Sequence, residues 1–173
     1  QVLVQAEATG PVSSKLVPKT SLSSRILYSI YIAFTGAETL ALCLAGMPFY
    51  DALLTSFATA CTGGFSVRNA SIAAYGLPAC EIIVTVFMLL CSVNFAVYFL
   101  LLTRRLKQAL KSDELRFFLC AVLGAVALIF WNLLPAYEAA GHTMRDTWFQ
   151  VASVGSTSGF STADFAQWPL LPQ

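Results

Sequence analysis

The sequence Thr62-Gly63-Gly64-Phe65-Ser66 returns 95 residues later as Thr157-Ser158-Gly159-Phe160-Ser161, and this repeat organises the whole chain. An aspartate stands eleven residues before each threonine, at Asp51 and at Asp146, so the register is kept without a gap. A long apolar segment precedes each copy. A loop that is duplicated between apolar segments is what an ion pore needs, and it suggests that backbone oxygens carry the chemistry.

Composition places the chain in a membrane. It is 57% hydrophobic and only 11% charged, with a mean hydropathy of +0.71, whereas soluble domains carry roughly a quarter of charged residues. Three apolar segments, residues 26–47, 82–103 and 117–137, each contain about the 20 residues that a helix needs to cross a bilayer. The sequence therefore predicts an all-α integral membrane protein.

The basic residues predict the orientation in the lipid bilayer. Eight of the ten Lys and Arg residues lie before the first apolar segment or between the second and the third. Cytoplasmic loops are enriched in such residues, so we expect the N-terminus inside and both duplicated phrases outside. A net charge of +1 gives no reason to expect a nucleic acid as partner.

The segments fall into four regions. Residues 1–24, rich in Ser, Pro, Lys and Thr, are expected to form a cytoplasmic linker. Residues 25–102 contain one unit made of a span, a half-helix, a loop and a second span. Residues 103–116 form a basic cytoplasmic loop, and residues 117–173 begin a second unit that reaches as far as its loop.

Each half-helix is expected to begin at its aspartate, which caps the N-terminus. A helix from Asp51 to about Cys61 is ~16 Å long, about half of a bilayer, so the chain has to turn at Gly63 and Gly64 and go back out. Glycine permits positive φ and exposed carbonyl groups there, and rings of carbonyl oxygens replace the hydration shell of a potassium ion. Because the negative end of the half-helix dipole also points at the loop, the pattern favours a weakly held monovalent cation.

The loops and their surroundings resemble those of a known family. Four segments are similar to the Trk/Ktr/HKT potassium transporter superfamily, most closely to its TrkH type: DALLTSFATACTGGFSVRNAS (51–71), DTWFQVASVGSTSGFSTADFAQWP (146–169), FMLLCSVNFAVYFLLLTRRLK (87–107) and QAEATGPVSSKLVPK (5–19). The resemblance implies span–half-helix–filter loop–span repeats with a potassium-channel-like architecture, four of them in a full-length chain. This sequence resembles the second repeat and the first part of the third, about one and a half units, and we expect it to be a fragment of the pore-forming subunit.

The resemblance also implies which residues hold the ion. By motif match, Gly64 and Gly159 correspond to selectivity-filter glycines, and a potassium ion is expected at the backbone carbonyls of the filter residues. These residues are Thr62, Gly63, Gly64, Phe65, Ser66, Thr157, Ser158, Gly159, Phe160 and Ser161. No cofactor is expected besides the transported ion. The implied partners are the remaining repeats, a second copy of the full-length chain and a cytoplasmic TrkA-type nucleotide-binding regulator, at the inner cell membrane.

Two other functions are open. The chain could be a structural membrane subunit that does not conduct, or an intramembrane serine protease that uses Ser158 and His142. A nucleophile needs a base within hydrogen-bond reach, and the first copy of the phrase has Gly63 in place of the serine and no histidine nearby. The duplication therefore favours a pore over an enzyme.

Several single residues have competing interpretations. Glu38 lies inside the first apolar segment, where an acid is a functional candidate by default; the alternatives are a protonated side chain or one bonded to a half-helix. We expect Asn94 to donate a hydrogen bond between helices and Arg68 to be a solvated charge. The five cysteines are interpreted as packing residues, not as a disulfide framework or a zinc site.

Overall fold

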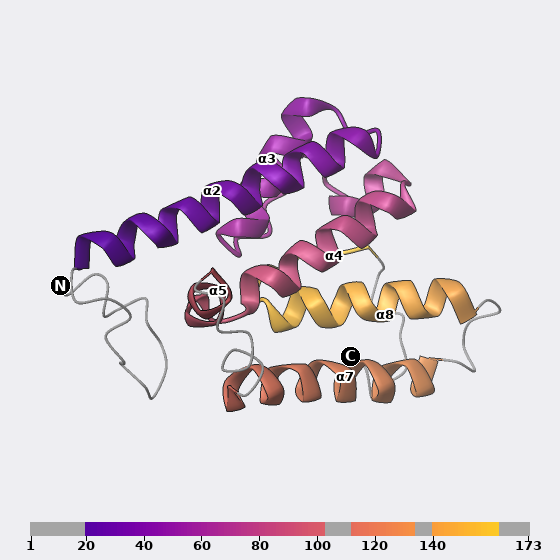
Figure 1. Cartoon of the computed structure of the whole chain (residues 1–173). Coiled ribbons are helices and arrows are strands. Elements are labelled where there is room, and N and C mark those ends of the chain that lie inside the picture. The colour runs from indigo at the N-terminus through magenta and orange to yellow at the C-terminus, as the bar shows by residue number, and fades with distance from the viewer. Residues whose placement is uncertain (1–19, 103–111, 134–139, 163–173) are drawn as a thin grey trace.

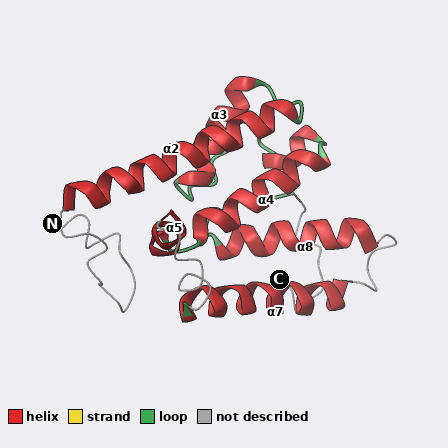
Figure 2. Ribbon diagram, in the orientation of Figure 1, coloured by secondary structure: helices red, strands yellow, loops and turns green. Residues whose placement is uncertain are grey.

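The computed structural model describes residues 20–102, 112–133 and 140–162. These residues form a helical assembly (Figure 1) and contain no β-strand (Figure 2), so the all-α prediction is confirmed. The expected linker and basic loop lie mainly on residues 1–19 and 103–111, outside the described ranges.

Two of the helices in the described ranges are long and apolar enough to cross a membrane. They are α2 (Thr20–Leu44) and α7 (Asp113–Leu133), close to the first and third predicted spans; the end of the third, residues 134–137, lies outside the described ranges. Only 22% of the apolar window in α2 and 11% of that in α7 is buried. Exposed apolar faces of this length fit contact with lipid or with further membrane helices.

The second predicted span is broken. Residues 82–103 were predicted as one continuous helix, which is wrong: α4 (Pro78–Ser92) ends at Val93, in an extended conformation with ψ 137°, and α5 (Phe95–Leu102) follows in another direction. Figure 1 shows α5 end-on while α4 lies along the page.

Polar side chains at the break explain it. The Ser92 hydroxyl donates to the carbonyl of Met88 at 2.7 Å, and the Asn94 side chain donates to Glu114 of α7 at 2.8 Å. Ser and Asn side chains compete with the helix for hydrogen bonds. The Ser92 bond stays within α4, and the Asn94 bond joins the break to the first turn of α7. The prediction that Asn94 bonds between helices is confirmed.

The half-helices are α3 (Phe49–Ala60) and α8 (Ala140–Gly155), which end 95 residues apart, as the duplicated phrases do. Their starts differ from the prediction. Pro48 occupies the N-cap position of α3 at φ −55° and makes no side-chain cap bond, because its ring has no hydrogen-bond acceptor. Asp51 therefore lies in the first turn, and Asp146 lies in the second turn of α8, so neither aspartate caps its helix.

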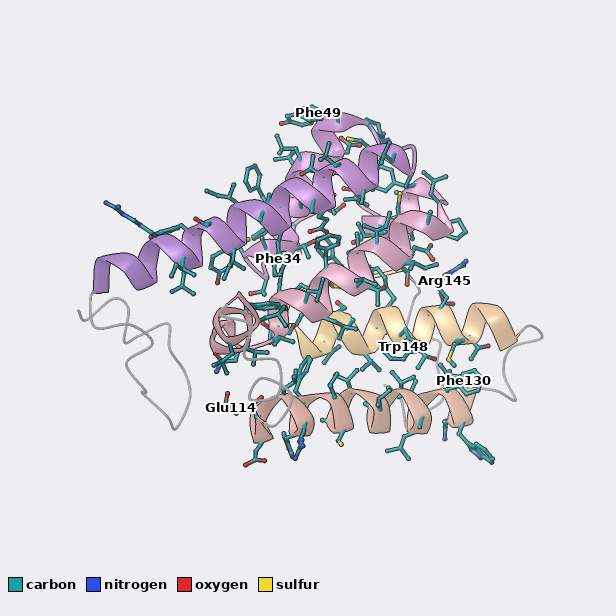
Figure 3. All side chains as sticks on the ribbon, viewed as in Figure 1. Phe34, Phe49, Glu114, Phe130, Arg145 and Trp148 are labelled. Atoms are coloured by element: carbon teal, nitrogen blue, oxygen red, sulfur yellow. The ribbon has the colours of Figure 1, made fainter. Side chains whose placement is uncertain are left out.

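One hydrophobic core joins the two halves of the chain. Helix α2 packs on α3, α7 packs on α8, and α4 contacts both α3 and α8 (Figure 1). The shared core is built from residues of both halves, among them Leu42, Ile72, Met88, Phe149 and Phe160. Trp148 of α8 fills a second, smaller core against α7 (Figure 3). The loops after α3 and α8 are thereby fixed by packing on the same helix, α4.

Candidate cation-binding loops

The two duplicated phrases form loops of the same shape, here called the first GFS loop (residues 62–66) and the second GFS loop (residues 157–161). Each half-helix ends with the same pair of hydrogen bonds, the Schellman arrangement that closes a helix C-terminus. The four bonds run from Thr62 N to Thr59 O (3.1 Å), Gly63 N to Ala58 O (2.8 Å), Thr157 N to Val154 O (3.0 Å) and Ser158 N to Ser153 O (3.1 Å).

A threonine takes the left-handed conformation at the start of each loop. The φ angles of Thr62 and Thr157 are 53° and 59°, in a region that costs a residue with a Cβ about 1–2 kcal/mol. Glycine normally occupies this position at a helix end. The same strained threonine in both loops indicates that its side chain serves a purpose there.

A glycine with positive φ follows two residues later in each loop. Gly64 has a φ of 61° and Gly159 a φ of 81°. Both glycines were expected to turn the backbone, and their positive φ angles agree with that role. Each GFS loop thus alternates a left-handed threonine with a left-handed glycine.

The two GFS loops touch each other through backbone. A Cβ atom built on Gly64 would lie 1.7 Å from the carbonyl oxygen of Ser158 and 2.7 Å from its carbonyl carbon. No side chain fits between them, so glycine is required at this position for the second loop to approach. Two phrases that are 95 residues apart in the sequence therefore form one site.

Side-chain hydrogen bonds hold the second GFS loop from behind. The Ser153 hydroxyl donates to the carbonyl of Phe160 at 2.6 Å, the Ser158 hydroxyl lies 2.9 Å from the sulfur of Met88, and the backbone N–H of Ser161 donates to Ser71 at 3.3 Å. The roles of Ser153, Met88 and Ser71 were not predicted from the sequence. Ser153 could have been selected from the sequence as a residue near the loop, because it lies on the half-helix about one turn before it.

The carbonyl groups of the loops are not equivalent. The Phe160 carbonyl accepts the bond from Ser153, and the Ser158 carbonyl faces Gly64. Within the described part of the chain, no hydrogen bond reaches the carbonyl oxygens of Thr62, Gly64 or Gly159. These three oxygens have no protein partner there, whereas that of Phe160 already has one.

The two phenylalanines of the loops lie in opposite surroundings. Phe160 is 1% exposed and belongs to the core beside α4, whereas Phe65 is 82% exposed. The sequence treats the two as equivalent, but only the second GFS loop has a helix of the preceding unit to pack against.

Asp51 fastens the segment that follows the first GFS loop. The Tyr75 hydroxyl, at the end of the 3₁₀-helix η1 (Ser71–Tyr75), donates to the Asp51 carboxylate at 2.8 Å. Arg68 lies 3.7 Å from the same carboxylate and over the Tyr75 ring. Burial, and then the bond and charge of Asp51, raise the pKa of Tyr75. Arg68 is thus exposed, as expected, but it also takes part in fixing the chain.

A second ion pair joins the two halves. Arg145 of α8 reaches Glu81 in the first turn of α4, with 2.6 Å between its Nε and a carboxylate oxygen. Figure 3 shows Arg145 on the side of α8 that faces α4. Since α8 carries the second GFS loop and α4 supports both loops, this contact helps to set the distance between them.

The donor set of the loops is made of neutral oxygens. Among the described residues there is no group of three His, Cys, Asp or Glu side chains that could hold a metal ion. All five cysteines are free thiols. Carbonyl and hydroxyl oxygens without fixed carboxylates suit a weakly held monovalent cation, because divalent ions require charged ligands or several retained waters.

The geometry does not fit the protease alternative. The Ser158 hydroxyl is buried between the Ser156 hydroxyl, at 2.8 Å, and the Met88 sulfur, and neither group is a base. His142 belongs to the first turn of α8, whose C-terminus precedes Ser158. Helix α8 rises ~20 Å from His142 to its last residue, Gly155, so His142 and Ser158 lie at opposite ends of the helix, far beyond hydrogen-bond reach.

Comparison with known proteins identifies the family of this chain. The model of the family TrkH, described as cation transport protein, matches residues 2–171. The Trk system potassium uptake protein TrkH of Escherichia coli (strain K12) is 37% identical over 97% of this chain and 36% of its own length. That of Salmonella typhimurium is 36% identical over the same shares. TrkG of Escherichia coli is 31% identical over 96% of this chain.

A solved structure agrees with these relatives. The crystal structure of the potassium transporter TrkH from Vibrio parahaemolyticus superposes with a TM-score of 0.85 at 31% identity, covering 92% of this chain and 35% of that one. The chain thus spans about a third of the length of the relatives that it matches.

Proposed function

Because this chain belongs to the TrkH family of cation transport proteins, we propose that it forms part of a pore through which a membrane protein takes up potassium. One observation carries the proposal: two loops with the same strained backbone meet at Gly64 and Ser158. Packing alone does not require a left-handed threonine in both loops, whereas a ring of backbone oxygens that all face the ion does require an unusual backbone.

In this proposal the GFS loops are the selectivity filter. The filter residues are Thr62, Gly63, Gly64, Phe65 and Ser66 together with Thr157, Ser158, Gly159, Phe160 and Ser161. The carbonyl oxygens of Thr62, Gly64 and Gly159 have no hydrogen-bond partner among the described residues, which supports their role as ion ligands. The carbonyl of Phe160 is the least suited of the set, because it accepts from Ser153.

The half-helices add an electrostatic contribution. Helices α3 and α8 both end at a GFS loop, so the negative ends of both dipoles lie at the site. A potassium ion that loses its hydration shell is stabilised there by partial charges only. Partial charges hold the ion weakly enough for it to leave, which a transport pathway requires.

We propose the following organisation of the chain. Residues 1–24 form a linker, residues 25–102 a full span–half-helix–loop–span repeat, residues 103–116 a basic loop and residues 117–173 the first part of another repeat. The exposed Phe65 supports further repeats, because the buried Phe160 packs against the preceding unit and Phe65 would do the same. The remaining repeats of a longer protein would close the ring around the ion.

The family consists of membrane proteins, and further details of the setting are proposed. The distribution of basic residues supports an N-terminus in the cytoplasm and GFS loops that open to the outside of the inner cell membrane. The proposed partners are a second copy of the full-length protein and a cytoplasmic nucleotide-binding regulator of the TrkA type. Its proposed activity is transport without an enzymatic step.

The test is potassium-dependent growth of cells that lack other uptake routes. The protein that carries this chain is expected to restore growth at low potassium, and Gly64→Ser and Gly159→Ser are expected to abolish it while the protein still reaches the membrane. Gly124→Ser is the matched control, because a Cβ on this α7 glycine meets nothing within 4 Å. Unchanged uptake in both loop variants would contradict the filter assignment.

A further inference from the structure

One peptide group of the second GFS loop is held at both of its polar ends. Its carbonyl group, which belongs to Phe160, accepts a hydrogen bond from the Ser153 hydroxyl of α8 at 2.6 Å. Its N–H group, which belongs to Ser161, donates to the Ser71 hydroxyl of η1 at 3.3 Å. The two serines come from different halves of the chain, so the Phe160–Ser161 peptide group is clamped between α8 and the segment that follows the first GFS loop.

The bond from Ser153 keeps the Phe160 carbonyl turned toward α8. Ser153 and Phe160 are each 1% exposed, so these two polar groups have little access to water. If the carbonyl turned away, it would leave a buried hydroxyl without this partner, which is strongly unfavourable. The orientation of the peptide group is therefore set by the protein and not by an ion.

Ser71 makes its bond from a strained backbone. Its φ angle is 54°, in the left-handed region that a residue with a Cβ rarely adopts. Among the described residues, the only other non-glycine residues with positive φ are Thr62 and Thr157, at the start of the two GFS loops. Strain of this kind is concentrated at functional sites, where the surrounding structure fixes it. The contact of Ser71 with Ser161 therefore indicates a role in the loop and not in packing alone.

The first GFS loop lacks the bond that corresponds to the one from Ser153. Ala58 stands 95 residues before Ser153, at the same position of its half-helix, and it has no hydroxyl to offer to the carbonyl of Phe65. Phe65 is also 82% exposed, whereas Phe160 is packed in the core. The backbone of the two loops thus repeats while the support behind it does not, and in the described part of the chain the second GFS loop is the more firmly held.

We propose that Ser153 and Ser71 are positioning residues of the selectivity filter, and that the clamped Phe160–Ser161 peptide group lets the pore distinguish potassium from sodium. This role depends on the pore function proposed above. Oxygens with a fixed spacing cannot close around the smaller sodium ion to replace its hydration shell, whereas a mobile loop can follow either ion. The clamped second GFS loop therefore sets the spacing of the oxygens, and the first GFS loop adjusts to it.

The test is uptake of potassium and sodium, each alone and in competition, by lipid vesicles that contain the purified protein that carries this chain. Ser153→Ala and Ser71→Ala are each expected to lower the ratio of potassium to sodium uptake roughly fivefold, because one hydrogen bond of the clamp is lost. The maximal rate of potassium uptake is expected to change less than this ratio, which a general loss of structure would not allow. Ser56→Ala is the matched control, because this fully buried serine of α3 donates to the carbonyl of Ala52 in its own helix at 2.8 Å.

The possible results separate the clamp from the pore function. Ser71 is only partly buried, so Ser71→Ala tests the clamp even if Ser153→Ala does not fold. Potassium uptake by the wild type with an unchanged ratio in the two clamp variants overturns the clamp and leaves the pore function standing. A wild type that does not distinguish the two ions, or a ratio that falls as far in Ser56→Ala, also overturns the clamp. No potassium uptake by the wild type overturns the pore function, and the role of the clamp falls with it.

Discussion

The Cα of Gly64 lies against the carbonyl group of Ser158, so closely that a Cβ on Gly64 would be 1.7 Å from that oxygen. This contact joins two loops that follow different half-helices. It also separates two glycines that the sequence pattern treats as equal, because a Cβ on Gly159 meets nothing within 4 Å.

The first prediction compares Gly64→Ala with Gly159→Ala. Both residues have positive φ, so each alanine costs about 1–2 kcal/mol of backbone strain. Gly64→Ala also forces the loops apart, which adds about 1–3 kcal/mol as overpacking does. Thermal unfolding of the purified variants in detergent is expected to show the larger loss for Gly64→Ala. Equal losses would contradict the close contact between the loops.

The second prediction concerns the left-handed threonines. Replacing Thr62 or Thr157 by glycine removes the strain of a Cβ at φ 53° or 59°, so each variant is expected to be more stable by about 1 kcal/mol. Potassium uptake is expected to fall, because the hydroxyl oxygen is lost. Thr143→Gly, in the regular part of α8, is the control and should be destabilising. A loss of stability in Thr62→Gly would show that the Thr62 hydroxyl stabilises the loop by more than its backbone strain destabilises it.

The third prediction is a pH dependence that originates at Tyr75. Its pKa is raised above the ordinary value of 10.0 by burial and then by Asp51. A raised pKa means that folding favours the neutral phenol of Tyr75. The contribution of Tyr75 to the free energy of unfolding is therefore complete below pH 10 and is lost as the pH rises through the folded pKa. The stability difference between wild type and Tyr75→Phe should therefore be constant up to that pH and shrink above it. A difference that grows at alkaline pH would rule out this role for the Asp51 contact.

The fourth prediction ranks the two ion pairs. The Arg145–Glu81 pair is short, and its side chains are 25% and 9% exposed, whereas Arg68 in the Arg68–Asp51 pair is 57% exposed. A double-mutant cycle with Arg145→Met and Glu81→Gln is expected to give a coupling energy of about 1–3 kcal/mol. The matching cycle with Arg68→Met and Asp51→Asn should stay below about 1 kcal/mol. The reverse order would show that the α4–α8 contact does not set the loop distance.

The fifth prediction uses the two loop phenylalanines. Phe160→Ala removes a fully buried ring and is expected to cost about 3–5 kcal/mol. Phe65 is exposed in this part of the protein, so Phe65→Ala alone would cost little unless another repeat covers it. In the longer protein we expect Phe65→Ala to destabilise by a similar amount to Phe160→Ala. A neutral effect there would count against a preceding repeat at this loop.

Some features were predicted from the sequence because they depend on local properties. Apolar segments of sufficient length predicted α2 and α7, and the glycines at Gly64 and Gly159 predicted the two bends. Other features depended on partners that the pattern does not show. Asp51 was expected to cap its helix, but Pro48 takes that position and Tyr75, 24 residues away, uses the carboxylate. Ser92 and Asn94 indicated a break between α4 and α5. The segment was nevertheless predicted as one helix, because its apolar length suits a continuous span.

The residues alone were enough to predict that this chain is helical, lies in a membrane and turns twice at equivalent glycines, because hydrophobicity and the absence of a Cβ are local properties. The packing of the helices was needed to show that Gly64 meets Ser158 and that Phe160 is buried while Phe65 is not. These relationships join residues that are far apart in the chain. They arise from how α2, α3, α4 and α8 pack, and packing is a property of the assembled helices together.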